Sequence, residues 1–152
     1  MSTSQIYNYR QVNDHLLTGG QPNEEQIRAA AQEGFTVVIN LATINPRYSL
    51  PDEAGLVQSL GMEYYHIPVD WEHPQPRDFV EFEKVMQDLP HEKILLHCAA
   101  NYRATAFYSL YALKHLGWTQ TQAEEFRDLI WRESHYPIWQ AFIRQITDTI
   151  IQ

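Results

Sequence analysis

The stretch KILLHCAANYRAT, residues 93–105, joins a short apolar run to a long apolar segment and holds the only cysteine of the chain. The run 93–98 predicts a buried strand, because it is short and mostly apolar. Residues 103–116 predict a helix that is apolar on almost every side, which is typical of a central, buried helix. Cys98 therefore lies where a strand ends and a buried helix begins, and only four residues separate it from Arg103.

The loop between this strand and this helix has the properties of an anion site. The backbone N–H groups of residues 99–103 have neither a strand partner nor a helical acceptor. If they surround one point, they bind an anion at the positive end of the helix dipole. A thiol in that place favours the thiolate form and is a nucleophile. Arg103 adds a permanent charge and a planar group that matches two phosphate oxygens.

These features predict displacement at phosphorus, with Cys98 and Arg103 as catalytic residues. The predicted substrate-binding residues are those of the loop and the helix start: Ala99, Ala100, Asn101, Tyr102 and Arg103. The loop has no glycine, so we expect Asn101 to adopt the left-handed conformation that such a tight turn requires. The alternative is a buried, inert cysteine beside a surface arginine.

The rest of the chain alternates strand and helix. We expect further strands at 15–18, 36–41 and 62–67, and further helices at 23–33, 52–61, about 79–89, 120–132 and from Pro137 onward. This order predicts an α/β fold, a mostly parallel sheet of four to five strands flanked by helices, in a single domain over residues 1–152. Ligands bind beyond the carboxyl ends of such strands, so the loops 19–22, 68–77 and 98–103 are expected to lie together.

Composition limits the classes of function. The chain has 152 residues, 44% of them hydrophobic, which suits a folded domain. Its net charge of −8 argues against nucleic-acid partners. A single cysteine excludes an intramolecular disulfide, and the seven histidines show no HExxH spacing, so we expect neither metal nor cofactor. Without a membrane-length apolar stretch or an apolar leader, we expect a cytoplasmic protein with no membrane partner.

Cleavage of a phosphate ester also needs a proton donor for the leaving group. The stretch PVDWEHPQPRD, residues 68–78, follows the strand at 62–67 and is expected to overhang the cysteine loop. We predict Asp70 as the general acid, with Glu72 second and His73 third. The alternative is that Asp70 only caps a turn.

Further residues are placed near the predicted site by their loops. Trp71 and Tyr102 either line the mouth of the pocket or pack in the core. Asn45, Arg47 and Tyr48, in the polar loop 43–51, are candidate substrate contacts. Gln21 either borders the site through the GGQP turn or belongs to a plain turn before a helix.

The sequence HCAANYRAT (97–105) is similar to the His-Cys…Arg signature of the protein tyrosine phosphatase superfamily. Residues 16–42 and 64–69 resemble a more specific group, the bacterial beta-lactamase-hydrolase-like phosphatase family. The resemblance covers about residues 12–116. It implies a tyrosine-phosphatase-like fold, a cysteine nucleophile, a phosphate-binding arginine and no metal, and it places His97 where the superfamily uses a histidine to help ionise the thiol. The alternative for His97 is a structural histidine whose hydrogen bonds are satisfied at the strand end.

The chain departs from the superfamily pattern in three ways. Most tyrosine phosphatases have five residues between cysteine and arginine, and this chain has four. The usual loop glycine is absent. The hydroxyl that often follows the arginine is displaced by one position, because Ala104 precedes Thr105; Thr105 stays a supporting candidate, although one residue turns a helical side chain by about 100°.

The sequence therefore predicts a cysteine-dependent phosphatase for phosphate monoesters, including phosphotyrosine, on a phosphorylated small molecule or phosphoprotein. Two alternatives remain. A rhodanese-like sulfurtransferase would carry a persulfide on Cys98 and need no general acid. A non-catalytic domain would bind phosphate groups in the same loop without turnover.

Overall fold

The computed structural model describes residues 2–132 and 134–151, and its centre is one five-stranded sheet in the order β1-β2-β5-β3-β4. The strands are β1 (Arg10–Asn13), β2 (Leu16–Gly19), β3 (Val37–Asn40), β4 (Glu63–His66) and β5 (Ile94–His97). Strands β2, β5, β3 and β4 run parallel, and β1 pairs antiparallel with β2 at the edge. The predicted α/β fold with a mostly parallel sheet is confirmed.

Strand β1 was not among the strand ranges predicted from the pattern. Its sequence, RQVN, is polar, and its side chains are alternately half-buried and exposed. Such an edge strand forms because it completes a tight hairpin with β2, and it carries too few apolar residues to be recognised alone.

The α-helices agree with the expected ranges to within a few residues. They are α1 (Glu24–Gln32), α2 (Glu53–Ser59), α3 (Pro76–Gln87), α4 (Tyr102–His115), α5 (Gln120–Trp131) and α6 (Pro137–Ile150). A 3₁₀ turn at Thr3–Gln5 lies outside the expected ranges. The predicted cap of α1 is present, since Asn23 accepts from the backbone N–H of Gln26 at 2.8 Å.

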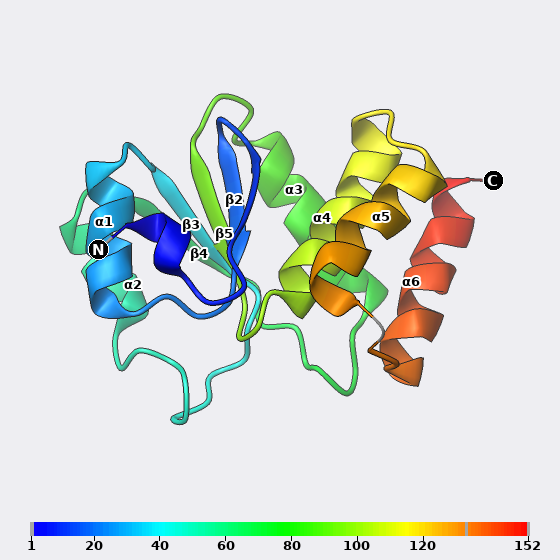
Figure 1. Cartoon of the computed structure of the whole chain (residues 1–152), viewed down its shortest axis with the longest axis horizontal. Coiled ribbons are helices and arrows are strands. Elements are labelled where there is room, and N and C mark those ends of the chain that lie inside the picture. Colours follow the sequence, from blue (N-terminus) through cyan, green and yellow to red (C-terminus); the bar gives the residue numbers. More distant parts are fainter. Residues whose placement is uncertain (1, 133, 152) are drawn as a thin grey trace.

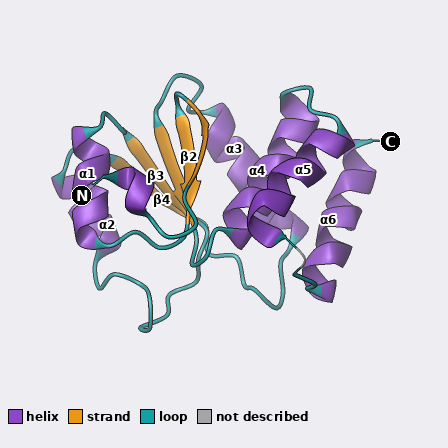
Figure 2. Ribbon diagram, viewed as in Figure 1, coloured by secondary structure: helices purple, strands orange, loops and turns teal. Residues whose placement is uncertain are grey.

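The sheet is covered by helices on both faces (Figures 1 and 2). Alternate strand residues point to opposite sides. Leu17 and Leu95 pack in the cluster that contains residues of α1 and α2. Leu16 and Leu96 pack in the larger cluster of α3, α4, α5 and α6. Helix α4 is buried along most of its length between the sheet and α5 and α6.

The carboxyl ends of the parallel strands meet at one edge, at the bottom of Figure 1. The backbone N–H of Gln21 donates to the carbonyl of Ala99 at 2.9 Å, and Gly20 forms a bridge with Ala100. A Cβ at Gly20 would lie 2.7 Å from the Ala99 carbonyl oxygen, so only glycine allows this approach. Arg103 contacts the carbonyl of Val69. The three loops therefore lie together, as predicted.

Within residues 2–132 and 134–151, no helix combines the length and the apolar character needed to span a membrane.

Candidate active site

Cys98 lies in a cavity of about 320 Å³ at the edge where the strands end. The cavity is lined by Tyr48, Trp71, Cys98, Ala99, Ala100, Tyr102, Arg103 and Tyr136. Only 1% of Cys98 is exposed, which places the sulfur at the bottom. The size is that of a small-molecule site.

The loop leaves backbone donors free beside the sulfur. Among the hydrogen bonds of the described residues, none uses the amide of Ala99, Ala100, Tyr102 or Arg103 as donor. All four of these residues line the cavity with Cys98. Free amides at the start of the 14-residue helix α4 suit an anion.

Asn101 has φ 71° and ψ 7°, so the predicted left-handed conformation is confirmed. Its side chain holds it there: Nδ2 donates to the carbonyl of Asn8 at 2.8 Å and to the hydroxyl of Thr18 at 3.1 Å. Asn101 is fully buried and faces away from solvent. It therefore shapes the loop from behind. Asn8 itself carried no signal in the sequence.

Arg103 is 5% exposed, and its guanidinium lies between two loops. Nη1 donates to the carbonyl of Val69 at 2.8 Å, and the group lies 5.9 Å from the ring of Trp71. This contact uses one of the five N–H groups of the side chain. Arg103 thus fixes the loop after β4 over the cavity and lines the cavity itself.

Behind the cysteine, His97 contacts a buried glutamate that the sequence did not single out. His97 Nε2 is 2.7 Å from Glu53 Oε2, and both side chains are buried. Glu53 is in the first turn of α2, where a glutamate is usually exposed and simply favours the helix dipole. Nothing in the local sequence distinguishes it from that ordinary case.

Glu53 is ionised in this environment. Burial would raise its pKa, but the charge of His97 and hydrogen bonds from His97, Gln21 and Tyr64 together hold the pKa below its ordinary value. Gln21 Nε2 donates to Glu53 Oε1 at 2.7 Å. Burial, followed by the charge of Glu53, strongly raises the pKa of Tyr64, so its hydroxyl remains protonated and can donate.

Asp70 lies on the loop over the site, but its carboxylate is not among the groups that line the cavity. Its side chain is 61% exposed. It accepts from the backbone N–H of Glu72 at 2.9 Å and faces His73 at 3.5 Å. The hydrogen bond from Glu72 holds the pKa of Asp70 below its ordinary value, with His73 contributing. Asp70 caps a turn in this conformation, and Glu72 and His73 are also outside the cavity.

Thr105 faces away from the sulfur. Its hydroxyl donates to the carbonyl of Asn101 at 2.7 Å and accepts from the indole N–H of Trp131 at 3.0 Å. The displaced hydroxyl therefore ties α5 to the start of α4, and it does not line the cavity.

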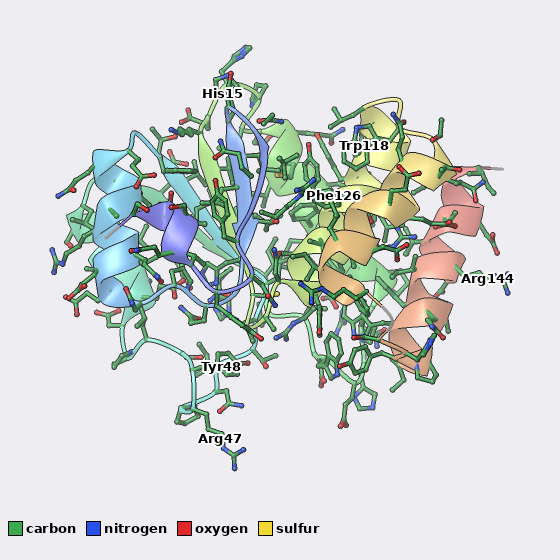
Figure 3. The ribbon with its side chains drawn as sticks, viewed as in Figure 1. His15, Arg47, Tyr48, Trp118, Phe126 and Arg144 are labelled. Atoms are coloured by element: carbon green, nitrogen blue, oxygen red, sulfur yellow. The ribbon has the colours of Figure 1, made fainter. Side chains whose placement is uncertain are left out.

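The cavity walls are aromatic. Trp71 both lines the cavity and packs in the core, with its ring 6.0 Å from Tyr102 and 5.0 Å from Tyr136. Its carbonyl accepts from the indole N–H of Trp139 in α6 at 2.7 Å. Tyr48 completes the wall from the protruding loop between β3 and α2 (Figure 3). Tyr136 had no sequence signal, because its place depends on how α6 packs.

In the part of the chain that the structure describes, no three His, Cys, Asp or Glu side chains lie close enough to hold a metal ion. A second groove of about 450 Å³, between α5 and α6, contains no residue of the cysteine loop.

No protein-family model matches the chain. A beta-lactamase hydrolase-like protein from Xylella fastidiosa (strain Temecula1) is 26% identical over 102 residues. This match covers 65% of this chain and 23% of that protein, so the chain spans about a quarter of the length of the curated relatives it matches. The resemblance predicted from the sequence is confirmed.

Solved structures of phosphatases and phosphatase-like proteins are also similar to this chain. TpbA from P. aeruginosa, in complex with pTyr, is 14% identical with a TM-score of 0.75 over 95% of this chain and 88% of that chain, which shows the fold. A protein from Shewanella putrefaciens CN-32, described as a candidate phosphatase (DUF442), is 36% identical with a TM-score of 0.86, covering 97% of this chain and 95% of that chain. The chain belongs to the DUF442 family of phosphatase-like proteins, and its fold is that of the tyrosine phosphatases.

Proposed function

We propose that this protein is a cysteine-dependent phosphatase that hydrolyses aryl phosphate monoesters. The observation that supports it most is the common cavity of Cys98, the free loop amides and Arg103. A thiol nucleophile next to anion donors suits phosphoryl transfer.

The reaction proceeds in two displacements. The Cys98 thiolate attacks phosphorus, the bond to the ester oxygen breaks, and the alcohol leaves with a proton. Water then attacks the cysteinyl-phosphate, which releases inorganic phosphate and restores the thiolate. The amides of Ala99 and Ala100 and the guanidinium of Arg103 stabilise the charge on the phosphoryl oxygens in both steps.

The walls favour an aromatic ester. Tyr48, Trp71, Tyr102 and Tyr136 offer ring faces to a planar leaving group. Arg103 is the sole Lys or Arg among the residues that line the cavity, so the site suits one phosphate group better than several. The complex of TpbA with pTyr is consistent with such a ligand on this fold. Both phosphotyrosine in a protein and small aryl phosphates satisfy this description.

Asp70 is the proposed general acid. It lies between Val69, which binds Arg103, and Trp71, which lines the cavity. A change of its side-chain rotamer, with release of the N–H of Glu72, is therefore the movement that would turn the carboxyl toward the leaving group.

The experiment is hydrolysis of p-nitrophenyl phosphate in the presence of EDTA. We expect turnover in wild type, inhibition by vanadate, and loss of turnover in Cys98→Ser, because a hydroxyl at this position is a far weaker nucleophile. Turnover in Cys98→Ser equal to that of wild type would refute the proposal.

The position of Asp70 outside the cavity supports a second candidate function, sulfur transfer. Sulfur transfer needs no general acid, and no carboxylate lines the cavity. In that reaction Cys98 attacks the outer sulfur of thiosulfate, the S–S bond breaks and sulfite leaves; cyanide then takes the sulfur as thiocyanate. Clear thiocyanate formation, together with no phosphate release, would replace the phosphatase proposal with a sulfurtransferase.

A further inference from the structure

The buried pair of Glu53 and His97 lies directly behind the nucleophile. His97 is fully buried at the end of β5, and its two ring nitrogens face two oxygen atoms. Nε2 lies 2.7 Å from Glu53 Oε2, and Nδ1 lies 3.2 Å from the carbonyl oxygen of Cys98. A carboxylate and a carbonyl only accept hydrogen bonds, so both contacts are hydrogen bonds at once only when both ring nitrogens carry a proton. This arrangement suits an imidazolium.

Glu53 is what keeps this buried cation stable. An isolated buried charge is costly, and a paired one is tolerated when its partner is well hydrogen-bonded. The Glu53 carboxylate meets that condition, because Gln21 Nε2 donates to Oε1 at 2.7 Å and the Tyr64 hydroxyl lies beside it. Tyr64 is fixed in turn by Asn40 Nδ2, at 3.0 Å.

The hydrogen bond from His97 also sets the direction of a loop amide. The carbonyl of Cys98 and the N–H of Ala99 belong to one planar peptide, in which the two groups point in opposite directions. With the carbonyl turned back toward His97, the N–H of Ala99 is turned away from it. Ala99 lines the cavity, and its N–H has no acceptor among the described residues.

We propose that Glu53 is a positioning residue: through His97 it holds an imidazolium behind Cys98 and aims the Ala99 amide at the bound oxyanion. The inference concerns the reactivity of Cys98, so it applies to the phosphatase proposed above and does not depend on that activity. Among the described residues, the other titratable side chain that contacts the pair is Tyr64 on β4.

The test uses Glu53→Gln, which keeps the size of the side chain and removes its charge. Without the carboxylate, the buried imidazolium loses its counter-charge and one ring proton, so no cation remains behind Cys98 to favour the thiolate. Because the chain has one cysteine, alkylation by iodoacetamide reports on Cys98 alone. We expect the alkylation rate of Glu53→Gln at pH 6 to fall at least tenfold, and the rate at pH 10 to match wild type, because there the thiolate is formed in both.

A matched control is available in Glu83→Gln. Glu83 is buried and forms the other Glu–His pair of the described residues, with the partly exposed His115 at 2.6 Å, between α3 and α4 and outside the cysteine cavity. This variant should alkylate like wild type at both pH values. If Glu83→Gln slowed alkylation as much as Glu53→Gln does, the effect of Glu53→Gln would be explained by general destabilisation, and the inference would be overturned.

Two further readouts separate positioning from structure. Nitrogen-15 NMR should show both ring nitrogens of His97 protonated in wild type and one unprotonated in Glu53→Gln. In a His97→Asn background, adding Glu53→Gln should change alkylation at pH 6 less than twofold, because the relay is already broken. A neutral His97 in wild type, or independent effects of the two substitutions, would contradict the proposal. Failure of phosphate hydrolysis would leave all these readouts unchanged.

Discussion

Asn8 and Asn101 bind each other's loops in a reciprocal pair. Asn101 Nδ2 donates to the carbonyl of Asn8 at 2.8 Å, and Asn8 Nδ2 donates to the carbonyl of Ala100 at 3.0 Å. Both asparagines have positive φ, of 52° and 71°. The N-terminal segment thus holds the glycine-free cysteine loop in its left-handed conformation.

The first prediction concerns that conformation. Asn101→Ala should lose the buried hydrogen bonds, at about 1–3 kcal/mol, and also incur the left-handed strain of alanine, at about 1–2 kcal/mol. Asn101→Gly should lose the hydrogen bonds alone. Urea unfolding should therefore rank the free energy of unfolding as wild type, then Asn101→Gly, then Asn101→Ala. An alanine variant more stable than the glycine variant would contradict this account of the loop.

The second prediction concerns the guanidinium of Arg103. Arg103→Lys keeps the charge and loses the planar fork that matches two oxygens. We expect kcat/KM for p-nitrophenyl phosphate to fall by about 10²- to 10³-fold, the usual cost of one oxyanion donor. The exposed Arg77→Lys, on α3, is the control and should match wild type. Full activity in Arg103→Lys would mean that charge alone suffices.

The features of this fold that the sequence predicts are those set by residues that are neighbours in the chain. The strand of 93–98, the helix of 103–116 and the left-handed Asn101 follow from local rules of periodicity and backbone sterics. The proximity of the loops 19–22, 68–77 and 98–103 is also predictable, because parallel strands have their carboxyl ends at one edge of the sheet.

The residues that the sequence interpretation missed are placed by long-range packing. Glu53 is buried because Gln21, Tyr64 and His97 surround it, and these come from the turn after β2, from β4 and from the end of β5. Tyr136 reaches the cavity only because α6 packs beside Trp71. A single sequence contains no local pattern for either arrangement.

The third prediction tests Asp70 through the leaving group. If Asp70 donates the proton, Asp70→Asn should lower kcat for phenyl phosphate by about 10²-fold or more, as expected for loss of general acid catalysis. It should lower kcat much less for p-nitrophenyl phosphate, whose leaving group needs little protonation. Equal losses on the two substrates would remove Asp70 from the role of acid.

The fourth prediction follows from the pKa of Asp70. The hydrogen bond from the N–H of Glu72 holds this pKa below the ordinary 3.8, so the protonated fraction falls as pH rises through the acidic range. An acid must be protonated to act, so kcat for phenyl phosphate should decrease from about pH 5 to pH 7. The pH profile of Asp70→Asn should lack this decrease, and an unchanged slope in the variant would assign it to another group.

The fifth prediction is a loss of stability in acid. The pKa of Glu53 in the fold lies below its ordinary 4.5, so the ionised carboxylate contributes stability that is fully present above about pH 4.5 and is lost as pH falls through the folded value. The difference in unfolding free energy between wild type and Glu53→Gln should be largest near pH 7 and shrink below pH 4.5. Glu81→Gln, on the exposed face of α3, should show almost no difference at any pH. If the difference in unfolding free energy between wild type and Glu53→Gln grew as the pH fell, the pKa of Glu53 would be raised in the fold, which would refute this prediction.

The covalent state of Cys98 during turnover tests the central claim most directly. Wild-type protein is mixed with p-nitrophenyl phosphate, quenched in acid within the first turnover, and measured by mass spectrometry of the peptide that contains Cys98. We predict that this peptide gains the mass of one phosphoryl group, and that the gain is absent in Cys98→Ser. An unmodified Cys98 peptide while phosphate is released, or one that gains sulfur from thiosulfate and never phosphate, would contradict the phosphatase account.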